Sequence, residues 1–322
     1  MAPPARASVS LQRRRRDATG PTFATPIASR RQIVKFGLIP GYYAAPVATA
    51  DYAKGLACLA EDLGFESIWP VEHVVMPEEY TSTYPYSPDG RMPIPDAAIP
   101  DPIIWNTWAA AHTTNLIVGT AMTILPQHNP VVYAKALASL DALSGGRVIL
   151  GAGVGWLREE AEAVGTDFSN RGKRTDEYID AMKVLWSDRI ASYSGDYVSF
   201  DRVKCSPHPV QAGGIPIHIG GHSKAAARRA GLRGDGFLPL GGSLSELGDL
   251  FKLVEDTAKE AGRDASKIEL TYSGMASHDA ALEIEQTGAH RMLIASLDAD
   301  LETAKRTLGE FSENVISKFG SA

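Results

Sequence analysis

The stretch at residues 145–156 is Gly145-Gly146-Arg147-Val148-Ile149-Leu150-Gly151-Ala152-Gly153-Val154-Gly155-Trp156. An apolar, strand-like run follows a Gly-Gly stop, and three alternate glycines then lead to a tryptophan. Alternate glycines at the end of a strand leave bare backbone where a flat ligand can lie, or ease strand packing around a bulge. Both interpretations stay open here. The spacing is not the Gly-x-Gly-x-x-Gly fingerprint of dinucleotide-binding folds.

Outward from this stretch, apolar runs alternate with amphipathic helical patterns. We predict eight strands, at residues 33–39, 65–69, 116–125, 147–151, 215–219, 236–240, 268–273 and 291–295. Asn129-Pro130 is a strong helix start, with an amide cap and proline in the first turn. Eight apolar strands alternating with helices predict an α/β fold, the (β/α)8 TIM barrel. An open doubly wound sheet is the alternative, but its phosphate loop after the first strand is missing.

Two insertions interrupt this alternation. Residues 74–102 are polar and proline-rich without a periodic pattern, which predicts a lid or substrate loop containing Tyr80, Tyr84 and Tyr86. Residues 189–214 form a second excursion, with a hairpin expected around Ser194-Gly195-Asp196.

The charge is unevenly distributed along the chain. Residues 1–31 contain seven arginines and one acid and carry a net charge of +6. Because the whole chain carries −6, residues 32–322 must carry −12. We interpret 1–31 as a disordered, Arg-rich tail and 32–322 as the barrel domain, with a translation start near Val34 as an alternative. The acidic body argues against nucleic acid as a partner.

No apolar segment follows the arginines of the tail, so neither a secretory signal nor a membrane span is predicted. Cys58 and Cys205 lie far apart and form no metal or redox spacing. A reducing, cytoplasmic location is therefore expected, without a metal site or a membrane partner.

In a parallel barrel, the carboxyl ends of the strands build the active face. The second strand ends in Trp69 and then Glu72-His73, a carboxylate and an imidazole suited to proton transfer near neutral pH. A hydrogen-bonded structural histidine is the alternative. Trp156, after the fourth strand, could form a pocket wall by stacking or pack as a buried anchor.

The third and fifth strands contribute candidates without acid–base chemistry. Small residues at 119–123 would let a planar cofactor approach the backbone, although they fit an ordinary barrel core equally well. The fifth strand is followed by Gly220, Gly221, His222 and Ser223 at the start of a helix. Backbone amides at such a positive dipole end suit a phosphate or another anion, although Gly-Gly is also a common turn.

At these residues the chain resembles the luciferase-like monooxygenase superfamily, in its deazaflavin (coenzyme F420)-dependent branch. The resemblance covers the chain from about residue 33 to its end. It rests on the blocks at residues 125–130, 143–147, 151–160, 171–178 and 207–221.

The resemblance implies a barrel of the bacterial luciferase type with insertion loops. His73 and the preceding Glu72 would be the candidate catalytic residues, with His73 facing the reactive edge of the cofactor ring. The peptide bond Ala121-Met122 would be cis. Trp69 and Tyr84 would line the substrate pocket. The implied cofactor-binding residues are Ala121, Met122, Gly153, Gly155, Trp156, Gly220, Gly221, His222 and Ser223.

One departure concerns the proton-donating glutamate of the sugar-phosphate dehydrogenases of this superfamily, which aligns with Trp156. Glucose 6-phosphate is therefore not the expected substrate, and we do not assign the role to Glu159 or Glu160. The first hypothesis is hydride transfer between F420 and a small organic substrate. The alternatives are an FMN-dependent monooxygenase that uses O2 and a flavin-binding protein without turnover. A homodimer is the expected assembly.

Overall fold

The computed structural model describes residues 35–43, 45–274 and 276–319. The tail predicted at 1–31 lies outside these residues. No helix in the described part of the chain is long and apolar enough to cross a bilayer.

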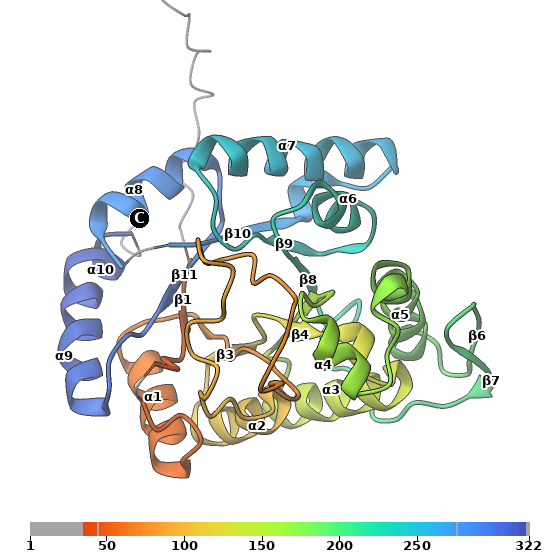
Figure 1. Ribbon diagram of the computed structural model, residues 1–322, viewed down its shortest axis with the longest axis horizontal. Helices are drawn as coiled ribbons and strands as arrows, with labels where there is room; N and C mark the ends of the chain where they lie inside the picture. Colours follow the sequence, from red (N-terminus) through yellow and green to blue (C-terminus); the bar gives the residue numbers. More distant parts are fainter. Residues whose placement is uncertain (1–34, 44, 275, 320–322) are drawn as a thin grey trace, which may run out of the picture. The chain divides into compact units, whose positions relative to one another are not determined.

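Eight parallel strands close into a barrel, which confirms the predicted TIM-barrel fold. β1 pairs with both β2 and β11, and the ring closes where β3 pairs with β5 (Figure 1). The barrel strands are β1 (Lys35–Ile39), β2 (Ser67–Ile68), β3 (Ile117–Gly119), β5 (Val148–Gly153), β8 (Ile217–Gly220), β9 (Gly236–Leu238), β10 (Glu269–Ser273) and β11 (Arg291–Ala295).

The third barrel strand is broken where we predicted one continuous strand over 116–125. After β3, a separate β4 (Thr123–Ile124) continues along β5. Between the pairs Gly119–Ile149 and Thr123–Ala152, the third strand advances by four residues and β5 by three, so one extra residue bulges out. The peptide Ala121-Met122 in this bulge is cis, as the resemblance implied.

Helices surround the strands at nearly all the predicted positions. Asn129 caps its helix by accepting hydrogen bonds from the backbone of Val131 and Val132, and Gly145 ends that helix in the left-handed region, both as predicted. The helices are α1 (Ala50–Asp62), α2 (Pro102–His112), α3 (Pro130–Ser144), α4 (Arg158–Ala163), α5 (Arg171–Ser187), α6 (Lys224–Arg233), α7 (Leu244–Glu260), α8 (His278–Thr287), α9 (Leu301–Phe311) and α10 (Ser317–Phe319).

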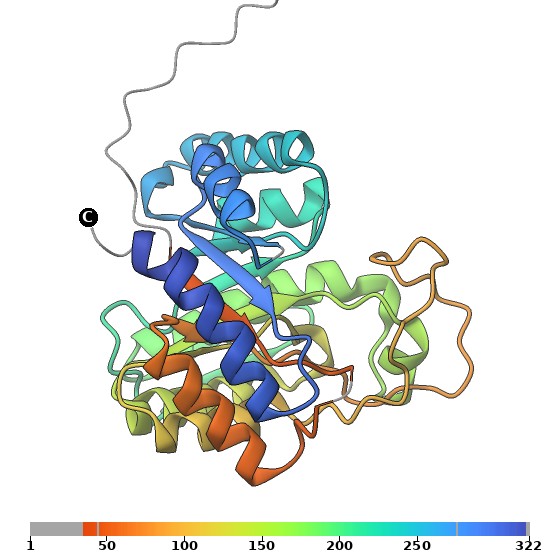
Figure 2. The same cartoon turned by 90° about the vertical axis from the view of Figure 1, so that its left-hand side faces the viewer.

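Three details differ from the sequence-based expectation or refine it. The helical segment after β11, where the alternation predicted a single helix, is divided by a π-helical turn over Ser312–Ile316. The excursion contains the expected hairpin, β6 (Ala191–Ser194) with β7 (Ser199–Val203). The predicted loop forms neither helix nor strand from 74 to 101, and it extends from the end of the barrel toward which the β11 arrow points (Figure 2).

Trp69 fills the barrel interior and does not line a substrate pocket, so that prediction is wrong. Its side chain is 0% exposed, and its indole nitrogen donates to Ser67 Oγ at 2.7 Å. Gly37 and Gly119 make the room, because a Cβ on either would lie 2.9 Å or 2.4 Å from the indole. The short β2 turns this side chain inward, below the strand exits.

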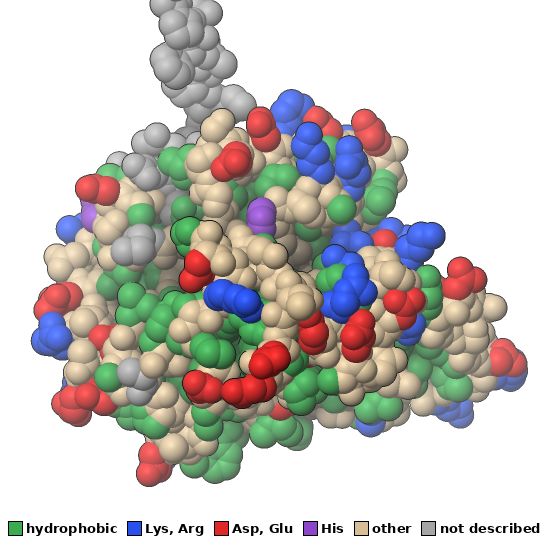
Figure 3. Space-filling view, viewed as in Figure 1, with side chains coloured by type: hydrophobic (Ala, Val, Ile, Leu, Met, Phe, Trp, Pro, Cys, Tyr) green, Lys and Arg blue, Asp and Glu red, His purple; other side chains and the backbone are tan. Residues whose placement is uncertain are grey.

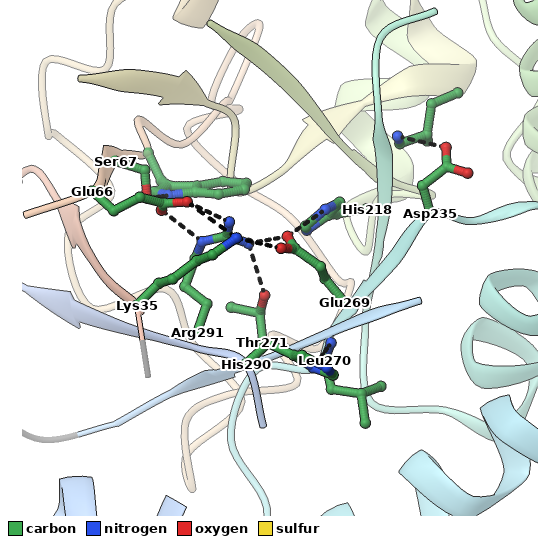
Figure 4. Close-up of polar contacts among 12 residues, drawn as sticks. Lys35, Glu66, Ser67, His218, Asp235, Glu269, Leu270, Thr271, His290 and Arg291 are labelled. Carbon is green, nitrogen blue, oxygen red and sulfur yellow. Dashed lines mark hydrogen bonds and ion pairs between the residues drawn. The ribbon is translucent and has the colours of Figure 1, made fainter. Parts of the chain in front are cut away.

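The amino-terminal end of the barrel interior is closed by ion pairs around Arg291 (Figure 4). Arg291 is 1% exposed and donates two hydrogen bonds to Glu66, at 2.8 and 2.9 Å, and one to Glu269 at 2.9 Å. Its guanidinium lies 5.5 Å from the centre of the Trp69 ring. Burial favours the neutral acids, but Arg291 together with Lys35 outweighs this effect, so the Glu66 pKa falls below 4.5 and the Glu269 pKa falls to about 2.

Replacing Arg291 with methionine should lower the free energy of unfolding by about 3–5 kcal/mol, because two partly buried carboxylates lose this guanidinium and keep only the more exposed Lys35. Chemical denaturation measures this change. Lys252→Met is the matched control: its ion pair with Asp256 is exposed, and we expect no measurable change in the free energy of unfolding. Equal losses in the two variants would contradict the assignment.

The same cluster predicts acid sensitivity. Because the pKa of Glu269 is lowered to about 2 in the folded state, its contribution to stability is complete above the ordinary carboxylate pKa and is lost as the pH falls toward 2. Unfolding free energies measured between about pH 5 and pH 2 should therefore decline. The decline should be shallower in Glu269→Gln, and an identical slope in that variant would refute this origin.

Candidate active site

A cavity of about 550 Å³ opens at the carboxyl ends of the strands, a size typical of small-molecule sites. It brings together nearly all the residues that the sequence analysis singled out from four separate strand ends. Those lining it are Glu72, His73, Tyr84, Ala121, Met122, Gly153, Gly155, Trp156, Gly220, Gly221, His222 and Ser223.

The floor of this cavity is the bulge of the third strand, which lies against the alternate glycines. A Cβ on Gly151 would lie 1.8 Å from the Thr120 carbonyl oxygen, and one on Gly220 would lie 2.5 Å from Met122 Cγ. Gly151 does not line the cavity, so close backbone packing explains this glycine. Gly153 packs against Met122 in the same way, but it also lines the cavity. A ligand can therefore approach the backbone at Gly153.

Glu72 supports the bulge and is not free for the proton transfer that we expected of it. Its carboxylate is 6% exposed and accepts a hydrogen bond from the Ile124 backbone at 2.6 Å. His128 Nε2 lies 3.0 Å from the same carboxylate. Burial opposes the charge on His128, but Glu72 outweighs this effect and raises the His128 pKa. Both carboxylate oxygens therefore serve structural partners.

His73 keeps one ring nitrogen available. Its Nδ1 lies 3.1 Å from Glu160 Oε2, whereas Nε2 has no hydrogen-bond partner in the part of the chain that the structure describes. The ring lines the cavity and is 10% exposed. Glu160 was not among the predicted site residues. Its position soon after Trp156, in what is the first turn of α4, was the only feature of the sequence that could have indicated its contact with His73.

Aromatic rings from the predicted loop form the roof of the cavity. Tyr84 meets Trp156 edge-on at 5.0 Å between ring centres, and Trp156 lies 5.9 Å from the His73 ring. Tyr86 reaches the exit of β8, where its ring centre is 5.3 Å from that of His222. The loop therefore crosses from the end of β5 to the end of β8. Atoms of this loop cover the centre of the face shown in Figure 3.

Glu159 holds this loop to α4. Its carboxylate accepts hydrogen bonds from the backbone and hydroxyl groups of both Thr81 and Ser82, at 2.6–3.2 Å. Although burial favours the neutral acid, these donors lower the Glu159 pKa to about 2. The attachment is therefore fully charged at neutral pH.

The opposite end of the cavity can hold an anion. The backbone N–H groups of His222 and Ser223 have no hydrogen-bond partner among the described residues, and they precede α6, whose first turn Ser223 caps. Gly221 was predicted to offer its amide too, but that N–H donates to Leu238 O at 3.3 Å. Arg171, which the sequence analysis did not assign, lines the same cavity.

Two observations limit the chemistry of this site. Glu72 and Arg171 are the only Asp, Glu, Lys or Arg residues among its described lining residues. No three His, Cys, Asp or Glu side chains within the described ranges are grouped so that they could hold a metal ion. The site is thus an aromatic and apolar chamber with two imidazoles, those of His73 and His222, and one anion-binding end.

A parallel barrel with such a chamber at the carboxyl ends of its strands has the architecture of a TIM-barrel enzyme. The chain matches the luciferase-like monooxygenase family over residues 33–314 and belongs to it, which confirms the resemblance and makes the protein an oxidoreductase or monooxygenase. It is 32% identical over 286 residues to an uncharacterized protein of Mycobacterium tuberculosis, covering 86% of this chain and 98% of that protein.

Characterised relatives and solved structures agree with this placement. The F420-dependent glucose-6-phosphate dehydrogenase of Kineococcus radiotolerans is 29% identical over 241 residues, which cover 73% of this chain and 65% of that protein. Monooxygenase RslO1 from Streptomyces bottropensis superposes with a TM-score of 0.71 at 20% identity, covering 89% of this chain and 100% of that one. An F420-dependent secondary alcohol dehydrogenase in complex with an F420-acetone adduct superposes with a TM-score of 0.71 at 19% identity. The match covers 88% of this chain and 98% of that one.

Replacing Glu159 with alanine should release the loop, because four hydrogen bonds from Thr81 and Ser82 lose their acceptor. Hydrogen–deuterium exchange should become faster in the peptide that contains residues 80–86, without global unfolding. Glu162→Ala, an exposed change on the same helix, is the control. If both variants exchange alike, Glu159 does not hold the loop.

Proposed function

We propose that this protein is an F420-dependent oxidoreductase that transfers a hydride between the deazaflavin and a small, uncharged organic substrate. The observation that carries the proposal is that one cavity combines the available Nε2 of His73 with an anion-binding end at His222 and Ser223. The F420-dependent relatives support the choice of cofactor.

The residues present fit such a cofactor. The unpartnered amides before α6 would hold its phosphate, and Ala121, Met122 and Gly153 would lie under its ring. When bound, the deazaflavin accepts or donates the hydride. The protein's part is to orient the ring, exclude water through the loop, and move a proton at His73 Nε2.

The cavity walls favour an uncharged substrate. Glu72 is engaged by the bulge, and Arg171 donates to the backbone of Gly155 and Phe168, so neither is free beside His73. Trp156 and Tyr84 supply apolar, aromatic surface at this end. A phosphorylated sugar would find no free cation next to the imidazole, and Trp156 stands where the sugar-phosphate dehydrogenases carry their proton donor.

An FMN-dependent monooxygenase is the second candidate. The amide donors at His222 and Ser223 suit the phosphate of either cofactor, and monooxygenases are among the structures that share this barrel. A flavin-binding protein without turnover would use the same cavity.

Titration of the purified protein with F420 and with FMN, followed by ring fluorescence, tests the choice. We expect saturable binding of F420, with FMN weaker. Turnover with an uncharged alcohol or ketone should fall by about 100-fold or more in His73→Ala while cofactor affinity is kept, because general acid–base catalysis contributes that much.

Three outcomes would overturn parts of this proposal. Preference for FMN with O2-dependent product formation would favour the monooxygenase. Cofactor binding without hydride exchange with any donor would favour a binding protein. Full turnover in His73→Ala would remove the role of the imidazole.

A further inference from the structure

We propose that Glu160 is a positioning residue that fixes the tautomer of His73, so that Nε2 faces the cavity as a proton acceptor. The inference rests on the proposed function for its consequence in turnover. Its structural core, the tautomer of one histidine, can be tested without any cofactor.

The hydrogen bond between His73 and Glu160 can have only one direction. Glu160 Oε2 lies 3.1 Å from His73 Nδ1, and an ionised carboxylate can only accept. Nδ1 must therefore carry the hydrogen, and the neutral ring has its lone pair at Nε2. Nε2 is the nitrogen without a partner among the described residues, in a side chain that lines the cavity.

Glu160 is an acidic residue that is fully buried. Its side chain is 0% exposed, and its one ion-pair partner within the described ranges is His73. The other carboxylate oxygen accepts from the Val74 backbone at 2.7 Å, which fixes the segment that carries the imidazole. A buried carboxylate is costly unless it is paired, so this contact orients ring and backbone together.

The consequence for the reaction is a defined proton path. In the oxidation of an alcohol, a bound deazaflavin would take up the hydride of the carbinol C–H bond, and His73 Nε2 would accept the proton of the O–H bond. The resulting imidazolium keeps its Nδ1 hydrogen bond to the Glu160 carboxylate, which stabilises the positive charge. In the reduction of a ketone, Nε2 returns the proton to the carbonyl oxygen.

A purely structural role for Glu160 makes a different prediction. Glu160→Gln keeps a carbonyl oxygen for the Val74 amide but presents an N–H group to His73 Nδ1. Nδ1 then has to accept, and the hydrogen moves to Nε2. If Glu160 only held the Val74 backbone, this substitution would leave the His73 tautomer unchanged. If Glu160 sets the tautomer, the substitution moves the hydrogen from Nδ1 to Nε2.

The direct test is 15N NMR of the imidazoles in the cofactor-free protein, at an alkaline pH where histidine is neutral. The His73 signals are assigned by their absence in His73→Gln. We expect Nδ1–H in the wild type and Nε2–H in Glu160→Gln. A wild-type ring with Nε2–H would overturn the proposal by itself, even if the variant failed to fold.

Steady-state kinetics give the second readout. Glu160→Gln should lower kcat by about 10- to 100-fold, up to the lower bound of what general acid–base catalysis contributes, with KM changed less than about twofold. Glu162→Gln, on the exposed side of the same helix, is the control and should leave kcat unchanged. In a His73→Gln background, adding Glu160→Gln should cost nothing further, because Glu160 acts only through the imidazole.

The outcomes separate this inference from the proposed function. If the wild type neither binds F420 nor turns over, the proposed function fails, and the NMR result still decides whether Glu160 sets the tautomer. If the wild type turns over and Glu160→Gln keeps full kcat, the positioning role fails while the oxidoreductase stands. An additive loss in the double variant would also overturn it, since it would mean that Glu160 acts independently of His73.

Discussion

The close approach of the third-strand bulge to the strand beside it is the constraint on which the site depends. The Thr120 carbonyl packs directly on Gly151, where any side chain would collide with it. Glu72 then holds the far side of the bulge through the Ile124 amide. With the bulge in this position, Met122 becomes the floor of a cavity and not part of a filled barrel interior.

The two ends of the barrel use polar groups in opposite ways. At the amino-terminal end, Arg291 pairs with both neighbouring acids, so the loss of this guanidinium would leave two partly buried carboxylates with only the more exposed Lys35. At the carboxyl end, selected atoms are left without protein partners, notably His73 Nε2 and the amide of Ser223. Trp69 separates the two layers. The chemistry that we propose therefore lies at the end where these polar atoms stay available.

The first turn of α4 links the catalytic candidate to the roof of the cavity. Glu159 binds the loop and Glu160 binds His73, so two adjacent side chains hold two segments that leave the same strand exit. Trp156, a few residues earlier, contacts rings of both segments. Loop closure and imidazole orientation thus share one short support, which gives a physical reason for the insertion to lie directly over the site.

By itself, the sequence determined the eight barrel strands apart from the break in the third, the helix that begins after Asn129, the family, and the strand ends at which the candidate site lies. These follow from local periodicity, from capping residues such as Asn129, and from the rule that parallel strands of a barrel share one active face. Only the tertiary structure decided what each side chain does there. Trp69 and Glu72 lie at the predicted strand end but point into the barrel and at the bulge, while Glu160 reaches back to His73 across 87 positions. Such roles depend on distances between segments remote in the chain, and no local pattern encodes them.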